Sequence, residues 1–192
     1  MKTDIILAGV GGQGILTIAA AIGFASLYEK KFVKQAEVHG MSQRGGAVQS
    51  HLRISDGPVS SDLIPLGHAD LILSVEPMEA LRYLPYLTRQ GWVVTNSVPF
   101  ENISDYPSIN RIEQELKALP FSIWINADQI ARDCQSPKSS NIVMLGAASA
   151  YLGLGFDSLR AGVEQVFKRK GSEITDANIR ALEAGRNCSL KI

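Results

Sequence analysis

The chain opens with Asp4-Ile-Ile-Leu-Ala-Gly-Val-Gly-Gly-Gln-Gly-Ile-Leu-Thr17, which combines an apolar run, four glycines and the start of a longer apolar segment. Residues 5–8 are typical of a short buried strand, and the apolar segment 15–28 predicts a helix. A strand, a glycine turn and a helix in this order begin many open α/β sheets. Glycine leaves backbone N–H groups accessible and a helix N-terminus favours negative charge, so the turn is a candidate site for a phosphate or carboxylate.

The rest of the chain alternates predicted strands and helices and then ends in helices. The strands are predicted at about 32–38, 48–54, 71–75, 91–95 and 122–127, and the helices at 77–85, 109–119, 127–134, 142–152, 157–167 and 174–186. Ser140 or Asn141 is the expected N-cap of the helix at 142–152. This pattern predicts an α/β fold: a three-layer, open, mostly parallel sheet with helices on both faces and a helical C-terminal part. No repeat or linker divides the chain, so we expect residues 1–192 to form a single domain.

The composition is that of an ordinary globular protein and argues against several classes of partner. Of the 192 residues, 45% are apolar and 20% charged, and 19 acidic residues balance 19 lysines and arginines. No net positive charge favours nucleic acid or an anionic membrane, and the longest apolar stretches, 15–27 and 142–156, are too short to span a membrane. Cys134 and Cys188 are too few for an iron–sulfur or zinc site, so we expect a cytoplasmic protein that binds no metal.

The glycine loop, Gly9–Gly14, has two interpretations from its pattern alone. It fits the Gly-x-Gly-x-x-Gly loop that binds the pyrophosphate of NAD or NADP. That site usually has an acid at the end of the second strand, about 20 residues further on. Glu29 has this spacing but lies at a helix end, and Glu37 lies on the strand but too far along the sequence. The alternative is that the glycines only let a helix and a strand pack closely.

The segment Glu37-Val-His-Gly-Met-Ser-Gln-Arg-Gly-Gly46 has neither helical nor strand periodicity. It follows a predicted strand, so in an open α/β sheet we expect it at the carboxyl edge, beside the glycine loop. Arg44 could clamp a phosphate or carboxylate with its forked guanidinium group. The alternative is a β-turn that carries a surface arginine.

Three further features receive structural interpretations. His51 lies on the polar side of an alternating strand and is expected to be exposed. Asp70, Glu76 and Glu79 lie near a strand end where carboxylates can do acid–base work, but a solvated helix N-terminus is the preferred interpretation. The helix at 15–28 is apolar nearly all round, so we expect the sheet and a second element, such as another subunit, to cover it.

Two motifs at this spacing resemble a known family. Gly9-Val-Gly-Gly-Gln-Gly-Ile-Leu-Thr17, with His39-Gly-Met-Ser-Gln-Arg-Gly-Gly46 and a strand that ends Leu52-Arg-Ile-Ser55, resembles the gamma-type domain of 2-oxoacid:ferredoxin oxidoreductases. Asp70-Leu-Ile-Leu73 and Asn141-Ile-Val-Met-Leu-Gly-Ala147 extend the resemblance over nearly the whole chain. The Met-Ser-Gln-Arg-Gly-Gly form is most similar to the indolepyruvate branch, whereas pyruvate and 2-oxoglutarate branches tend to carry Gly-Pro-Glu-x-Arg-Gly-Gly.

The resemblance implies oxidative decarboxylation of a 2-oxoacid, an aryl pyruvate such as indolepyruvate, to an acyl-CoA, carbon dioxide and reduced ferredoxin. Thiamine diphosphate and iron–sulfur clusters do this chemistry, and the sequence contains neither a cysteine set for a cluster nor a Gly-Asp-Gly thiamine diphosphate motif. The resemblance therefore implies a subunit with no catalytic residue of its own. A large (alpha) subunit would bear both cofactors, and ferredoxin would be reached through the complex.

The implied site residues fall into two groups. Coenzyme A, another anion or no ligand would occupy the glycine loop, formed by Gly9, Gly11, Gly12, Gln13 and Gly14. Residues close to the partner or substrate would be Glu37, His39, Met41, Ser42, Gln43, Arg44, Gly45, Gly46 and Asn141. Lys30, Lys31 and Lys34 could assist an anion, although a solvated face is the preferred interpretation. A free-standing NAD(P)-binding domain and a purely structural assembly subunit remain the alternatives.

Overall fold

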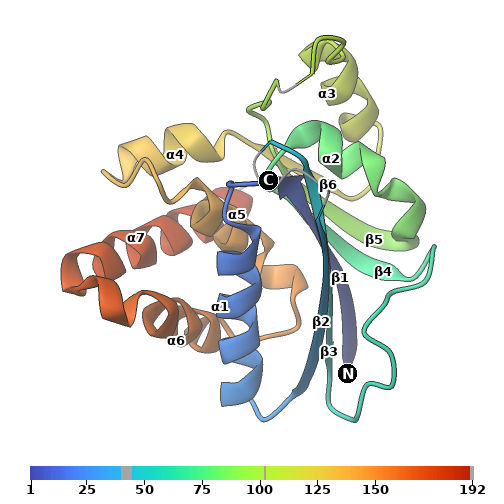
Figure 1. Cartoon of the computed structure of the whole chain (residues 1–192). Helices are drawn as coiled ribbons and strands as arrows, with labels where there is room; N and C mark the ends of the chain where they lie inside the picture. Colours follow the sequence, from blue (N-terminus) through green and yellow to red (C-terminus); the bar gives the residue numbers. More distant parts are fainter. Residues whose placement is uncertain (40–44, 102, 191–192) are drawn as a thin grey trace.

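The computed structural model describes residues 1–39, 45–101 and 103–190, and one six-stranded sheet forms its centre (Figure 1). The strands are β1 (Lys2–Val10), β2 (Phe32–His39), β3 (Ala47–Ser55), β4 (Ala69–Ser74), β5 (Leu87–Asn96) and β6 (Ser122–Ile125). Their order is β2-β3-β1-β4-β5-β6. β3 is antiparallel to both of its neighbours, and β1, β4, β5 and β6 are parallel to one another. The prediction of an open, mostly parallel sheet is confirmed.

β3 lies between β1 and β2. Phe32 is opposite Ser55 and His39 is opposite Val48 in the β2–β3 pair, and β3 also pairs along the whole of β1. β2 is consequently the edge strand, one strand removed from β1. In the dinucleotide-binding fold the second strand lies directly beside the first, so this order was not foreseen from the glycine pattern.

Helices cover both faces of the sheet, as predicted. One face carries α1 (Ile15–Tyr28), α4 (Ala127–Asp133), α5 (Ser140–Ala148), α6 (Phe156–Phe167) and α7 (Ser172–Ser189), and the other carries α2 (Pro77–Arg82) and α3 (Ile109–Lys117) (Figure 1). Short 3-10 turns are η1 (Leu84–Tyr86), η2 (Ser149–Tyr151) and η3 (Lys168–Lys170). A hydrophobic core lies on each face of the sheet, and successive β1 side chains alternate between them. Ile5 and Leu7 pack on the α1 side, and Ile6 and Ala8 pack on the other.

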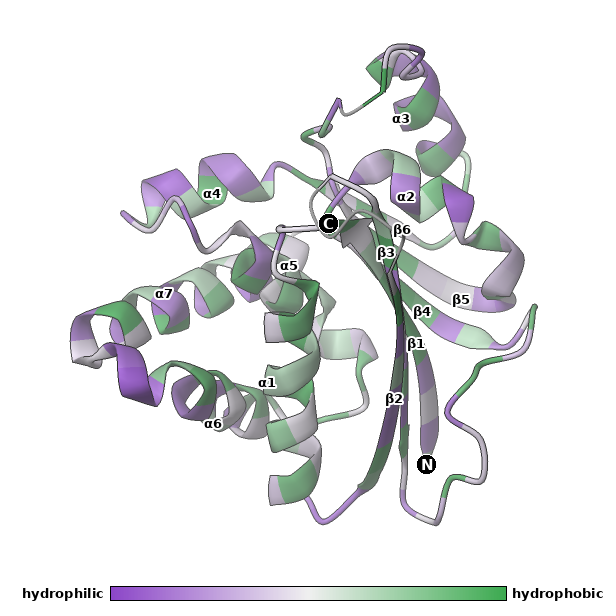
Figure 2. Cartoon of the chain, viewed as in Figure 1, coloured by the Kyte–Doolittle hydropathy of each residue, from purple (hydrophilic) through white to green (hydrophobic). Residues whose placement is uncertain are grey.

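α1 is hydrophobic over most of its surface (Figure 2), and its second neighbour is α6 of this same chain. A Cβ at Gly162 of α6 would lie 2.3 Å from the Ala21 carbonyl oxygen, so glycine allows the two helices to touch backbone to backbone. The expectation that α1 is covered on more than one side is confirmed. Leu16 and Leu27 remain 56% and 60% exposed on its outer side.

The prediction that His51 is exposed is wrong, because its side chain is only 2% exposed. The segment 56–68 folds back over β3, to which Ser61, Leu63 and Ile64 are hydrogen-bonded. The imidazole Nδ1 accepts the Ile64 N–H at 3.0 Å, and the ring meets the Tyr86 ring edge-on at 5.3 Å between centroids. Alternation identifies the face on which a side chain lies, but not what a distant loop places over that face.

Replacing His51 with asparagine should flatten the pH dependence of stability below neutrality. Burial lowers the pKa of His51 from its usual 6.5, helped by the Arg53 guanidinium and opposed by the Asp62 carboxylate. The folded state therefore binds fewer protons than the unfolded state, so stability is full above pH 6.5 and falls as pH drops toward the folded pKa. An asparagine Oδ1 can still accept the Ile64 N–H but does not titrate. Urea unfolding between pH 7 and 5 measures the difference, and equal slopes for both proteins would contradict the assignment.

Candidate functional site

The glycine loop connects β1 to α1 through two residues in the left-handed region, Gly12 (φ 101°) and Gly14 (φ 82°). Gln13 closes the loop: its Oε1 accepts the Val10 N–H at 2.8 Å, and its own N–H donates to the Val10 carbonyl at 3.1 Å. A Cβ at Gly9 would lie 2.4 Å from a Val75 methyl, so this glycine serves close packing. Space is open beside Gly12, where an added Cβ meets nothing within 4 Å.

The second motif reaches the glycine loop, as predicted for its described part. The Gly11 N–H donates to the Gly46 carbonyl at 2.8 Å, and the Gly45 N–H donates to the Gly11 carbonyl at 3.3 Å. Met41, Ser42, Gln43 and Arg44 lie outside the described residues. Glu37 and His39 are on β2, where the Glu37 carboxylate accepts a hydrogen bond from the Gln35 side chain at 3.5 Å.

Asn141 connects α5 to the same loop. Its Nδ2 donates to the Gly14 carbonyl at 3.2 Å, and its Oδ1 accepts the Ile142 N–H at 3.0 Å. The N-cap of α5 is Ser139, one residue before the predicted pair, because its carbonyl already accepts the N–H groups of Ile142 and Val143. The first turns of α1 and α5 therefore meet at the glycine loop.

A cavity of about 880 Å³ opens at this junction. Its walls are Gly12–Gly14 and Thr17, the segment 135–141, and the end of α6 with the start of α7. Among the described residues, the N–H groups of Gly12, Gly14, Ser140 and Asn141 have no hydrogen-bond acceptor, and all four residues line the cavity. Unpaired amides at two helix N-termini make this a favourable place for an anion.

A smaller cavity of about 180 Å³ adjoins the first, and Gln13 and Ser140 line both. It lies over the carboxyl ends of β4 and β5. Asn96 is 4% exposed there, donates from Nδ2 to the Asp128 carboxylate at 2.8 Å, and accepts the Ala127 N–H at 3.0 Å. The polar groups of this second cavity thus position α4.

The preferred interpretation of the acids as a solvated cluster is wrong. Glu76 is fully buried and Glu79 only 2% exposed, whereas Asp70 lies at the opposite end of β4 and accepts the Asp4 N–H at 2.8 Å. Glu76 does act at a helix N-terminus, since it caps α2 by accepting the Glu79 N–H at 2.8 Å. It also accepts hydrogen bonds from the Tyr106 hydroxyl and the Phe100 N–H, and so holds these two residues next to the start of α2. Burial raises the pKa of Glu79, while the adjacent Arg82 opposes the shift.

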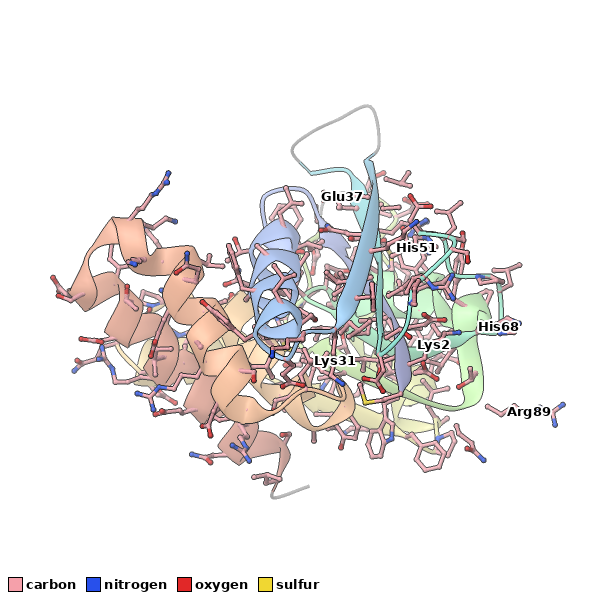
Figure 3. The ribbon with its side chains drawn as sticks, turned by 90° about the horizontal axis from the view of Figure 1, so that it is seen from below. Lys2, Lys31, Glu37, His51, His68 and Arg89 are labelled. Carbon is pink, nitrogen blue, oxygen red and sulfur yellow. The ribbon has the colours of Figure 1, made fainter. Side chains whose placement is uncertain are left out.

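The lysines at positions 30–34 lie far from the glycine loop. They follow the C-terminal end of α1, a helix of 14 residues, which places them about 20 Å from the loop at its N-terminal end. Figure 3 shows Lys31 and Glu37 at opposite ends of β2. The Lys31 ammonium is 2.8 Å from the Asp56 carboxylate, which helps hold the pKa of Asp56 at about 2. These lysines cannot assist an anion at the loop.

The described residues contain neither a metal-ligand cluster nor a helix that could span a membrane. Within the described ranges, no three or more His, Cys, Asp or Glu side chains are grouped as a metal ion would require. Cys134 follows α4 and Cys188 lies in α7, each as a free thiol. No helix in the same ranges has the length and apolarity needed to cross a membrane.

The sequence is similar to small subunits of oxoacid oxidoreductases. A family model described as pyruvate ferredoxin/flavodoxin oxidoreductase matches residues 4–188. Indolepyruvate oxidoreductase subunit IorB of Archaeoglobus fulgidus is 37% identical over 196 residues, which cover 97% of this chain and 95% of that protein. The IorB of Pyrococcus horikoshii is 37% identical over 195 residues, 95% of this chain and 93% of that protein. 2-Oxoglutarate synthase subunit KorC of Methanocaldococcus jannaschii is 29% identical over 148 residues, 77% of this chain and 73% of that protein.

Solved structures share the fold. The gamma subunit of a keto/oxoacid ferredoxin oxidoreductase from Geobacter sulfurreducens superposes with a TM-score of 0.71 at 23% identity, over 99% of both chains. The 2-oxoglutarate:ferredoxin oxidoreductase of Magnetococcus marinus, solved with 2-oxoglutarate, coenzyme A and succinyl-CoA, has a TM-score of 0.79 at 20% identity. That match covers all of this chain but 31% of the longer one.

Several cavity residues were missed by the sequence interpretation. Lys138 precedes α5 and Lys170 ends η3, and both line the large cavity. Gln135-Ser-Pro-Lys-Ser139, a polar run directly before a helix, was the available signal for Lys138. No local signal identified Lys170, because its place at the cavity depends on how α6 and α7 pack against α1 and α5.

Proposed function

We propose, since this chain belongs to the pyruvate ferredoxin/flavodoxin oxidoreductase family, that it is the small subunit of a cytoplasmic indolepyruvate:ferredoxin oxidoreductase. The complex would oxidatively decarboxylate an aryl pyruvate, with indolepyruvate as the leading substrate, to acyl-CoA, carbon dioxide and reduced ferredoxin. Residues 1–192 would act as one gamma-type domain within it.

The observation that carries this proposal is the sequence identity to IorB proteins, which extends over nearly the whole length of this chain and of each relative. It is 37% for two of them, against 29% over a shorter alignment for a 2-oxoglutarate synthase subunit. The Met41-Ser-Gln-Arg-Gly-Gly46 form of the second motif favours the same branch. A match over nearly the whole length of both sequences favours the same role for this chain.

The cofactors belong, in this proposal, to a large partner subunit. Thiamine diphosphate would supply the decarboxylation chemistry there, and iron–sulfur clusters would pass single electrons to ferredoxin. This chain would bind and position groups. The edge position of β2 argues against the alternative of a free-standing NAD(P) domain, because β3 separates the end of β2 from the glycine loop.

The glycine loop would hold a phosphate of coenzyme A. Three observations support this: unpaired N–H groups at the first turns of α1 and α5, a cavity of ligand size, and open space beside Gly12. The pairing of Gly11 with Gly45 and Gly46 supports a role for the second motif next to that phosphate. Arg44 would order the substrate or the partner there, as the motif predicts.

Exchange of Gly12 for aspartate or asparagine tests the site with a matched pair. The two side chains have the same shape and meet the same φ of 101°, a region that both tolerate better than most residues, so they differ in charge alone. In the complex purified anaerobically through a tag on this chain, Gly12→Asp should raise the KM for coenzyme A about tenfold or more, equivalent to about 1.4 kcal/mol. Gly12→Asn should stay within about threefold of the wild type, about 0.7 kcal/mol.

Two results would contradict these proposals separately. Equal KM values for the aspartate and asparagine variants would show that no anion binds at the loop, while the subunit assignment would stand. A tagged chain that brings down no large partner with thiamine diphosphate and iron–sulfur absorbance would refute the subunit assignment itself.

A further inference from the structure

Two lysines line the large cavity without a carboxylate partner. Lys138 lies in the segment before α5, and Lys170 lies at the turn between α6 and α7. In the part of the chain that the structure describes, neither ammonium has an acidic group within ion-pair distance. Lys2, Lys31 and Lys117 each have such a partner, at 2.6–2.8 Å.

The Lys170 side chain is held against the cavity wall. Its Nζ lies 5.1 Å from the centroid of the Phe167 ring, and Phe167 is a buried residue that also lines the cavity. A cation over an aromatic face is attracted to it without losing its capacity to donate hydrogen bonds. The ammonium of Lys170 is therefore positioned by the protein and still has donors for a ligand.

Charge around the cavity is locally positive although the chain as a whole is neutral. The cavity lining contains two lysines, Lys138 and Lys170, but only one carboxylate, that of Glu173. The partial positive charges of the α1 and α5 N-termini add to this excess. The unpaired amides are those of Gly12, Gly14, Ser140 and Asn141, whereas the lysines come from the segment before α5 and from the η3 turn. The cavity therefore has two separate sets of positive groups, whereas one phosphate would require only one.

We propose that Lys138 and Lys170 bind a second phosphate of the ligand whose first phosphate lies at the glycine loop. The inference rests on the proposed binding of coenzyme A at that loop. Coenzyme A carries a diphosphate and a separate 3′-phosphate, and the cavity of about 880 Å³ has room for both with the intervening ribose. The two lysines then select coenzyme A over 3′-dephospho-coenzyme A, which has the same reactive thiol.

The test compares the two thiols as acceptors in the purified complex at low ionic strength. Wild-type complex should show a KM for coenzyme A at least tenfold below that for 3′-dephospho-coenzyme A. The double variant Lys138→Gln, Lys170→Gln should raise the KM for coenzyme A alone and bring the two values within threefold. Lys168→Gln with Arg169→Gln is the matched control, because these exposed cations share the η3 turn but do not line the cavity. The control should keep the wild-type ratio.

Inorganic diphosphate provides a second readout that does not depend on the thiol. Because it would occupy the glycine loop, it should compete with coenzyme A about equally in the wild type, the control and the double lysine variant. Adenosine 3′,5′-bisphosphate, which carries the 3′-phosphate, should compete more weakly in the double lysine variant alone. A double variant that keeps the wild-type preference, or a wild type that does not distinguish the two thiols, overturns the role of the lysines. The glycine-loop proposal is decided separately by the Gly12 pair, so the two failures are distinguishable.

Discussion

Replacing Gly146 with alanine should lower the free energy of unfolding by about 3 kcal/mol or more, at the upper end of what overpacking costs. α5 and α7 cross with their backbones in contact: a Cβ at Gly146 would lie 2.0 Å from the Leu182 carbonyl oxygen. A Cβ at Gly185 would lie 2.0 Å from the Val143 carbonyl oxygen in return. Both obstacles are backbone atoms in the middle of helices, so neither can rotate away, and the helices must separate.

Gly23→Ala is the matched control for this substitution. Gly23 also lies inside a helix, α1, but a Cβ there meets nothing within 4 Å. Alanine should therefore stabilise the protein by about 0.5–1 kcal/mol through its higher helix propensity. Urea unfolding followed by far-ultraviolet circular dichroism measures both. If the two variants shift the midpoint in the same direction, close contact of α5 and α7 is not what requires glycine at position 146.

Replacing Arg53 with methionine should cost about 3–5 kcal/mol, because it leaves the carboxylate of Asp4 buried without its main partner. The Asp4 side chain is fully buried, and Arg53 binds both of its oxygens, through Nε at 2.8 Å and a terminal nitrogen at 3.1 Å. Arg53 also donates to the carbonyls of Ser61 and Leu63, at 3.1 and 3.0 Å, and so ties the segment 56–68 to β3.

Lys2→Met is the matched control, because it also removes a cation next to Asp4 but one that is exposed to solvent. The Lys2 ammonium is as close to Asp4, at 2.8 Å, but its side chain is 52% exposed, so its loss should cost less than about 1 kcal/mol. Asp4→Asn in the Arg53→Met background should recover part of the lost stability, since position 4 then carries no buried charge. Comparable losses for Lys2→Met and Arg53→Met would contradict this account.

The local elements and the family could be predicted from short patterns in the sequence. Apolar runs, glycines and helix periods placed α1 at its observed bounds and the middle of β1, whose observed range, Lys2–Val10, is longer than the predicted 5–8. They also predicted a mostly parallel sheet with helices on both faces. The position of the second motif directly after a predicted strand also predicted that it lies beside the glycine loop, and the bonds between Gly11 and Gly45–Gly46 confirm this for the described residues. These features depend on neighbours close in sequence or on the rule that parallel strands end at one edge.

Which side chains are buried, and which ones lie together at the site, depends on contacts between elements that are distant in the sequence. β3 lies between β1 and β2, so β2 does not pair with β1. No local sequence pattern predicts this strand order. The segment 56–68 buries His51. Lys31 lies far from the glycine loop because the 14-residue helix α1 separates them. Lys170 reaches the cavity from more than 150 positions along the chain, because α6 and α7 pack on α1 and α5 through their glycines. Such contacts depend on how distant elements pack, and periodicity within a single element carries no information about that packing.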